Sequence, residues 1–420
     1  MSPRPTRLRE AHCHIFQTGR ALGMLDLGAC PTRGAVLDRI ADHARAHRAG
    51  PILCHSARPE AWPEPAWPAL GDLDRVVGER VCVAWCFDYH ALFAGSAAMS
   101  GAGFDDASPD PPNGALGRDA GGGLNGVCYE AAALRVWESV PEPIGAERTA
   151  MVRGALDHLS AWFDEVHDLK AQPWLAGELA AIERDGALPC DVVLWPLVED
   201  LPAIAQGRSA WTTDRVRLGG GKVFTDGTLN SRTAHMLHPY ADRMPEHPRG
   251  MAMMTTDQIE QAVRTCDALG VPMAAHAIGD GAVRSVLDAI ERARPATPGF
   301  RIEHAELIDG ADVRRFVDLG VVASVQPCHL LVDIEALRRA VPDRLDRVLP
   351  LRELLDAGCE PGRLDGPGLV FGSDAPIVRA DPEDSVLAAT RRARADMGTG
   401  EAINADQALD ADTAWACFAL

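Results

Sequence analysis

Four histidines and one aspartate fall at or near the ends of short apolar runs of the sequence. They are His12, His14, His276, His304 and Asp374. His12 and His14 are two residues apart, so in a strand both imidazoles lie on one face while Cys13 points to the other. Four imidazoles and a carboxylate suit a borderline divalent metal such as zinc. A single histidine at a strand end is more often a hydrogen-bonded structural residue, so the metal hypothesis requires these residues to meet.

Lys222, in the stretch GGGKVFTDG, is a sixth candidate because lysine is rare in this chain. Of the 41 basic residues, only Lys170 and Lys222 are lysines. Where arginine serves as the general cation, a retained lysine suggests a role that needs an amine able to lose its proton. The three glycines before Lys222 do not form a phosphate-binding loop, because Val223 follows where such a loop needs serine or threonine. They predict backbone clearance within or beside a strand.

Eight short apolar runs alternate with stretches of helical periodicity. The predicted strands are residues 11–15, 165–169, 191–197, 216–225, 271–276, 300–304, 321–326 and 368–372. The predicted helices include residues 255–269, 281–293, 309–319 and 382–397. Such alternation implies parallel pairing and predicts an α/β fold, a closed (β/α)8 barrel of the TIM type, whose C-terminal strand ends meet at one mouth. An open doubly wound sheet is the alternative, but the sequence has no glycine-rich dinucleotide-binding turn after an early strand.

Residues 18–150 are rich in Gly, Pro, Ala and Asp and show little sustained periodicity. They are predicted to be a long irregular insertion after the first strand, a lid or substrate subdomain within one hydrolase domain spanning residues 1–420. Within it the pattern predicts a helix at 32–48, a strand at 80–87 and a loop tract at 95–123. Three residues of the insertion are candidates for a substrate pocket, with simple packing as the alternative: Trp85, His90 and Tyr129.

Four polar residues follow the fourth and seventh predicted strands and are candidates for substrate contact. They are Asp226, Asn230, Arg232 and Gln326. The alternative is that the loop DGTLNSRTA folds on itself and uses its Asp and Asn as turn formers. His329 and Asp333, which follow the seventh strand, are further candidates.

The charge balance and the cysteines limit the classes of partner and of site. Sixty acidic against 41 basic residues give a net charge of −19, which repels nucleic acid and an anionic membrane surface alike. No stretch approaches the roughly 20 apolar residues of a membrane span or the apolar core of a signal peptide, so we expect a cytoplasmic protein. The eleven cysteines form no CxxC pair and are expected to be buried, reduced packing residues.

Six sequence blocks, in order, resemble amidohydrolase family 3 of the amidohydrolase superfamily, which includes enzymes similar to N-substituted formamide deformylases. The blocks are HCH on the first strand, KVFTDGTLNSRTA, HAIGD, RIEHAE, SVQP and FGSDAP. The resemblance implies that His12 and His14 bind one metal, that His276 and His304 bind a second, and that Asp374 completes the first. Lys222 matches a position where family members can carry a carbamylated lysine bridging two metals, with a single-metal site as the alternative.

The resemblance also implies a reaction, in which a metal-activated water hydrolyses an amide-type C–N bond, other than a peptide bond, in a small molecule. A divalent metal lowers the pKa of bound water toward about 7 and polarises the carbonyl. Asp374 would take the proton of that water and pass it to the leaving nitrogen. The same residues could instead cleave lactones, phosphoesters or cyclic ureas, or the chain could be a non-catalytic regulatory or binding barrel. A serine hydrolase is disfavoured because no G-x-S-x-G turn occurs in the sequence.

Members of this family usually also carry a β-sandwich built from segments before the first strand and after the last helix. Here eleven residues precede His12 and the sequence ends at Leu420, so we expect the sandwich to be absent, either naturally or because the sequence is clipped. A clipped chain would expose an apolar flank of the barrel and is expected to be poorly soluble or to form homo-oligomers.

Overall fold

The computed structural model describes residues 5–242 and 247–420, which separate into two compact units. The smaller unit is Gly19–Met151, and the larger unit contains the chain up to Thr18 and from Val152 onward. The sequence places its insertion at 18–150, close to these bounds. The role of the smaller unit as a lid stays a prediction.

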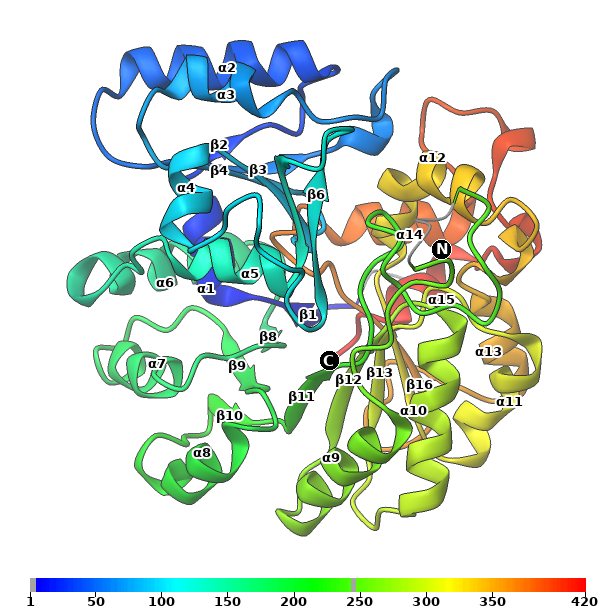
Figure 1. Cartoon of the computed structure of the whole chain (residues 1–420). Helices are drawn as coiled ribbons and strands as arrows, with labels where there is room; N and C mark the ends of the chain where they lie inside the picture. The colour runs from blue at the N-terminus through cyan, green and yellow to red at the C-terminus, as the bar shows by residue number, and fades with distance from the viewer. Residues whose placement is uncertain (1–4, 243–246) are drawn as a thin grey trace. The chain divides into compact units, whose positions relative to one another are not determined.

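Two sheets of parallel strands form the centre of the larger unit (Figure 1). The first sheet has the order β1 (Arg9–Cys13), β8 (Glu165–Asp168), β9 (Asp191–Leu194) and β10 (Val216–Leu218). The second has the order β11 (Gly221–Phe224), β12 (Met273–Ala277), β13 (Arg301–His304), β14 (Val322–Val325), β16 (Gly368–Phe371) and β15 (Glu360–Pro361). Each of the eight predicted runs overlaps at least one strand, and the predicted α/β class is confirmed.

The fourth predicted strand is divided into β10 and β11 by Gly219 and Gly220. A Cβ atom on Gly219 would lie 2.5 Å from the Trp195 ring, and one on Gly220 would lie 2.2 Å from the Pro272 carbonyl oxygen. These glycines therefore provide backbone clearance beside a strand, as the sequence predicts.

Contacts beyond the regular ladders link strands of the two sheets. Cys13 forms a parallel bridge with Ala375, just after β16, and Leu197, just after β9, forms one with Lys222 of β11. The sheet order itself does not show a closed barrel, so the closed form stays a prediction at this point.

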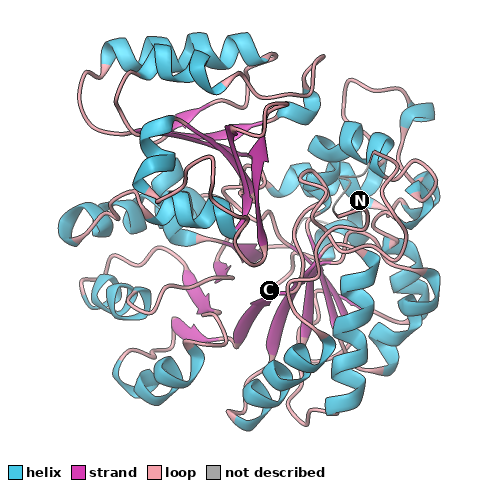
Figure 2. Ribbon diagram, in the orientation of Figure 1, coloured by secondary structure: helices cyan, strands magenta, loops and turns pink. Residues whose placement is uncertain are grey.

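Helices follow the parallel strands of the larger unit, and Figure 2 shows helices beside the strands of both sheets. They are α7 (Leu175–Arg184), α8 (Leu201–Gly207), α9 (Thr256–Ala268), α10 (Asp280–Ala293), α11 (Gly310–Asp318), α12 (Leu330–Ala340), α13 (Leu351–Ala357), α14 (Pro382–Arg391) and α15 (Ala411–Ala416). Thr255 and Gln258 form a capping box at the start of α9. The strands between the helices are almost entirely buried, as expected for parallel sheets covered on both faces.

The predicted helix at 382–397 is too long, because α14 ends at Arg391. Arg392 adopts a left-handed conformation, with φ of 56°. Its buried guanidinium donates hydrogen bonds to the carbonyl oxygens of Ile403, at 3.1 Å, and Val348, at 2.7 Å. These contacts turn the chain out of the helix, an effect that helical periodicity does not reveal.

The smaller unit has its own six-stranded sheet, so the expectation of an irregular insertion is wrong. The strand order is β2 (Leu25–Asp26), β3 (Ile52–Ala57), β4 (Cys82–Cys86), β5 (Ala91–Ala94), β7 (Leu124–Glu130) and β6 (Gly114–Arg118). Its helices are α2 (Arg33–Ala46), α3 (Leu70–Val77), α4 (Ser96–Gly101) and α5 (Ala131–Glu138), and the connecting helices to the larger unit are α1 (Ile15–Ala21) and α6 (Gly145–Ser160). The predicted helix at 32–48 and strand at 80–87 correspond to α2 and β4, but the predicted loop tract at 95–123 contains α4 and β6.

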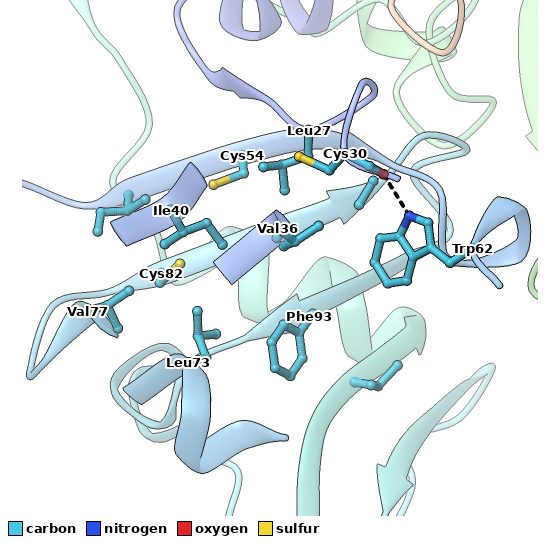
Figure 3. Close-up of a cluster of buried hydrophobic side chains, with 14 residues drawn as sticks. Leu27, Cys30, Val36, Ile40, Cys54, Trp62, Leu73, Val77, Cys82 and Phe93 are labelled. Carbon is cyan, nitrogen blue, oxygen red and sulfur yellow. Dashed lines mark hydrogen bonds between the residues drawn. The ribbon is translucent and has the colours of Figure 1, made fainter. Parts of the chain in front are cut away.

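An apolar cluster packs α2 and α3 against this smaller sheet (Figure 3). Val36 and Ile40 of α2 and Leu73 of α3 are completely buried in it. Trp62 closes the cluster and donates a hydrogen bond from Nε1 to the carbonyl oxygen of Cys30, at 2.9 Å. This packing gives the segment a core of its own, which its small and polar composition does not suggest.

All eleven cysteines of the chain are free and buried, which confirms their predicted packing role. None of the helices in the described residues is long and apolar enough to cross a membrane.

Candidate metal centre

Three buried residues from different strand ends offer ligand atoms that all lie within 4.8 Å of one another: His12, His304 and Asp374. His12 lies near the end of β1, His304 is the last residue of β13, and Asp374 follows β16. Parallel strands present their C-terminal ends at one edge, so residues far apart in the sequence can meet there. The predicted convergence of these three residues is therefore present.

His14 and His12 both point toward the carboxylate of Asp374. Nε2 of His14 lies 3.0 Å from Oδ1 of Asp374, and Nε2 of His12 lies 3.3 Å from the same oxygen. Cys13 points the other way, because its Sγ contacts the carbonyl oxygen of His167 at 3.4 Å. The HCH motif thus places both imidazoles on one face, as period-2 alternation predicts.

The backbone around the centre is strained at two of these residues. The φ angles are 70° at His304 and 62° at Asp374, in a region where a residue other than glycine costs about 1–3 kcal/mol. Asp374 is held in place because its N–H donates to the carbonyl oxygen of His12, at 2.7 Å. Gly372 permits this approach, since a Cβ there would lie 2.6 Å from Oε1 of Glu10 and 2.7 Å from the His12 nitrogen.

The electrostatics of the centre keep His12 and His304 neutral and Asp374 ionised. Burial lowers the pKa of His12 to about 4 and lowers the pKa of His304 well below its ordinary value. Burial alone would raise the pKa of Asp374, but His12 and His14 outweigh it and hold that pKa below the usual range. Neutral imidazoles and an ionised carboxylate are the forms that bind metals.

These donors fit a divalent metal. Two imidazoles and a carboxylate are ligands of zinc-type sites. Nδ1 of His304 is buried and has no hydrogen-bond partner among the described residues. An unsatisfied buried atom of this kind is expected where a ligand completes the site.

Lys222 and His276 lie near the centre but outside the group of three. Burial lowers the pKa of Lys222 to about 8, although the carboxylates of Glu303 and Asp374 oppose this shift. Its Nζ is buried without a hydrogen-bond partner in the part of the chain that the structure describes. The ring of His276 lies 4.5 Å from that of His304, and its Nε2 lies 3.1 Å from the carbonyl oxygen of Gly227.

Two buried glutamates at the centre were not predicted from the sequence. Glu303 lies 2.6 Å from Nδ1 of His12, measured from Oε2. Glu10 accepts hydrogen bonds at Oε1 from the backbone N–H groups of His12, at 3.0 Å, and Ser373, at 2.8 Å, and burial raises its pKa to about 8. The sequence offers one signal for these two glutamates, which is the alternation of side chains along a strand. Glu10 precedes His12 by two residues, and Glu303 follows Arg301 by two residues in the same buried strand.

Among the residues predicted to contact substrate, Asp226 and Arg232 form hydrogen bonds with neighbouring residues of the chain. The Asp226 carboxylate accepts the N–H groups of His235 and Gly279, both at 2.9 Å. Arg232 donates from Nε to Asp242 at 2.8 Å and to carbonyl oxygens of its own loop. These contacts favour the alternative in which the DGTLNSRTA loop folds on itself.

The remaining polar candidates are Asn230, Gln326, His329 and Asp333. Asn230 donates from Nδ2 to Asp333. Gln326 donates to the carbonyl oxygen of Ser324 at 3.4 Å, and its Oε1 is buried without a partner among the described residues. Nε2 of His329 lies 4.0 Å from Oδ2 of Asp374, which places this histidine beside the group of three.

The three substrate-pocket candidates of the predicted insertion all lie in the smaller unit. Trp85 is buried and stacks on Tyr89 at a centroid distance of 5.4 Å. Nδ1 of His90 lies 2.8 Å from Oε2 of Glu130, and Tyr129 pairs with Ala91 within the sheet. Their part in a substrate pocket stays a prediction.

Curated proteins of related sequence include one named as an amidohydrolase and one named as a deformylase. The chain is 25% identical over 427 residues to the amidohydrolase YtcJ of Bacillus subtilis (strain 168), covering 95% of this chain and 75% of that protein. It is 24% identical over 432 residues to the N-substituted formamide deformylase of Arthrobacter pascens, covering 95% of this chain and 76% of that protein.

Solved structures and a family model agree with this likeness. The chain aligns with an uncharacterized metal-dependent hydrolase from Pyrococcus horikoshii OT3 with a TM-score of 0.73 and 24% identity, over 98% of this chain and 78% of that one. This alignment establishes the similarity of fold. The model of the amidohydrolase family matches residues 8–420, so this chain belongs to the amidohydrolase family.

Proposed function

We propose that this protein is a metal-dependent hydrolase that cleaves an amide-type C–N bond, other than a peptide bond, in a small molecule. The observation that carries the proposal is the buried convergence of His12, His304 and Asp374, whose ligand atoms lie within 4.8 Å of one another. Membership of the amidohydrolase family and the similarity to a protein named N-substituted formamide deformylase support an amide-type substrate.

We further infer that the strands of the eight predicted runs, all in the larger unit, close into one barrel. The bridge between Cys13 and Ala375 and the bridge between Leu197 and Lys222 support this arrangement. In a closed barrel β1 and β16 would be neighbours, which agrees with the hydrogen bond from the Asp374 N–H to the His12 carbonyl oxygen.

Zinc or a similar divalent cation, one or two per chain, is the proposed cofactor. When bound, such a cation lowers the pKa of a bound water and polarises the carbonyl oxygen of a substrate. His12, His14 and Asp374 would hold a first cation, and His276 and His304 a second. The Lys222 amine, with its pKa of about 8, is neutral in part near pH 7 and could add carbon dioxide with loss of a proton to form a bridging carbamate.

Asp374 is the proposed proton carrier. Its carboxylate is ionised and faces the imidazoles of His12 and His14 through Oδ1. It would accept the proton released as water attacks the carbonyl carbon, and then deliver that proton to the leaving nitrogen as the C–N bond breaks. Asn230 and Gln326 remain candidates for contacts with the substrate, as do Trp85, His90 and Tyr129 from the smaller unit.

The net charge of −19 supports a small molecule, rather than nucleic acid or an anionic membrane, as the binding partner. A cytoplasmic location and a homo-oligomeric state stay predictions.

Metal analysis combined with a substrate screen tests the proposed function. Protein produced with zinc supplementation should contain at least about one metal per chain, because an intact ligand set fills when the metal is available. It should then release amine from some members of a panel of N-formyl and N-acyl compounds. Less than about 0.1 metal per chain would favour the non-catalytic barrel, and cleavage of lactones or phosphoesters in place of amides would shift the reaction class.

A further inference from the structure

We propose that Glu303 is a positioning residue that fixes the tautomer and orientation of the His12 imidazole, and that Arg301 holds Glu303 in place for this purpose. The inference rests on the proposed function, since it takes His12 as a metal ligand. It adds a residue of this chain that acts on the centre without binding the metal itself.

The contact between Glu303 and His12 determines which ring nitrogen carries hydrogen. Oε2 of Glu303 lies 2.6 Å from Nδ1 of His12, and both side chains are completely buried. An ionised carboxylate only accepts hydrogen bonds, so Nδ1 must carry the hydrogen and Nε2 must keep its lone pair. Nε2 is the nitrogen on the Asp374 side of the ring, 3.3 Å from Oδ1. The contact thus presents the free lone pair to the centre.

Glu303 stays ionised despite its burial. The Arg301 guanidinium contacts both oxygens of this carboxylate, through Nε and one terminal nitrogen. A carboxylate paired in this way keeps its charge, so it accepts hydrogen bonds and does not donate them.

Arg301 fixes the position of Glu303 through contacts on several sides. Its Nε and one terminal nitrogen both contact the Glu303 carboxylate. That same nitrogen donates to the Ala11 carbonyl oxygen at 2.6 Å and to Oγ of Ser324 at 2.7 Å. The guanidinium also lies 5.0 Å from the ring centroid of Trp195. Because Ala11 directly precedes His12, Arg301 ties the backbone of β1 and the carboxylate of β13 together.

A second buried glutamate forms a comparable cluster that does not touch the metal candidates. Oε1 of Glu165 lies 3.1 Å from Nε2 of His167 and 3.0 Å from Nε of Arg9. His167 is buried like His12, but it is not among the residues whose ligand atoms converge. Nδ1 of His167 also lies 3.3 Å from the terminal nitrogen of Arg301 that does not contact Glu303. The chain therefore supplies a matched control, in which a similar buried His–Glu–Arg contact is lost while the contacts between Arg301 and Glu303 are kept.

The test compares Glu303→Gln with Glu165→Gln in the full chain. Zinc affinity is measured by competition with a chromogenic chelator after the metal has been removed, and the tautomer of His12 is read from nitrogen-15 NMR of the metal-free protein. We expect Glu303→Gln to weaken zinc binding about 10–100-fold and to remove the preference for Nδ1–H at His12. Glu165→Gln should change zinc affinity by less than about threefold.

The possible outcomes separate this inference from the proposed function. If the wild type binds zinc and Glu303→Gln binds it equally well, or if Glu165→Gln weakens it as much, the positioning role is overturned. If the wild type takes up no zinc, the proposed function itself fails, and this inference with it. Should Glu303→Gln not fold, Glu303→Asp keeps the charge but withdraws the oxygen from Nδ1. Unchanged zinc affinity in that folded variant would also overturn the inference.

Discussion

Nε2 of His14 and Oδ1 of Asp374 lie 3.0 Å apart, although the two residues stand near opposite ends of the chain. This contact brings the HCH motif of β1 and the segment after β16 to the same point. It also makes Asp374 the side chain on which the proposed proton transfer depends.

Replacing Asp374 by asparagine should abolish most of the activity, because an amide cannot take up the proton of the attacking water. We expect the rate of amine release from an N-formyl substrate to fall by about 10²–10⁴-fold. Metal content must be measured on the same sample, since Asp374 is also a candidate ligand. A variant that keeps full activity would contradict the assignment of Asp374 as proton carrier.

Lys222→Met should make the protein more stable and less active. The Lys222 amine is buried without a hydrogen-bond partner among the described residues, and replacing such a group with an apolar side chain of similar size relieves its desolvation. We expect a gain of about 1–2 kcal/mol in the free energy of unfolding, measured with urea on metal-free protein. Activity should fall at least 10²-fold if the lysine carries a carbamate or contacts the metal.

Carbon-13 NMR of protein supplied with labelled bicarbonate tests the carbamate directly. A carbamate resonance should be present in the wild type and missing in Lys222→Met. Its absence in metal-loaded wild type would leave Lys222 as an amine and favour a single-metal centre.

The stability of the protein should fall on acidification, in part because of His167. Burial lowers the pKa of this residue to about 4 in the folded state, from an ordinary value of 6.5. Between these two pH values the unfolded chain binds a proton that the folded chain does not, so stability decreases as pH falls from about 6.5 toward 4. The full effect is roughly 3 kcal/mol. Thermal unfolding followed across this range should show a weaker pH dependence in His167→Gln than in the wild type.

Gly372→Ala should damage both the fold and the centre. The added Cβ would lie 2.7 Å from the backbone nitrogen of His12, so β1 or the segment after β16 must move. We expect a loss of about 2–4 kcal/mol in the free energy of unfolding, together with weaker metal binding. Gly71→Ala in α3 is the control, since open space surrounds that position, and it should stabilise the protein by about 0.5–1 kcal/mol. Equal effects of the two substitutions would argue against a special role for Gly372.

The parallel strands of the larger unit could be predicted because strands buried on both faces are continuous apolar runs. The same pattern located His304 and Asp374, since they lie at or just past the end of such a run, and His12 lies within the first run. Glu303 was missed because its role depends on a contact with His12 on another sheet, which no local pattern reveals. The engagement of Arg232 could not be foreseen either, because its partner Asp242 follows the motif.

The sheet of the smaller unit was missed for a different reason. Some of its strands mix small and polar residues with apolar ones, as in β6 (Gly114–Arg118) and β7 (Leu124–Glu130), and therefore do not form continuous apolar runs. The apolar residues that complete its core, such as Ile40 and Leu73, come from helices. Only their packing in three dimensions identifies the segment as a folded unit.

The pairing of β1 with β8 has a consequence for the order in which this protein folds during its synthesis. The ribosome makes β1 first, but the chain of the smaller unit must emerge before β8 is available to pair with it. Asp374 is made later still, after all eight of the predicted strands. The carboxylate partner of the HCH motif is therefore synthesised long after the motif itself. We expect the complete centre to bind metal only at the last stage of folding.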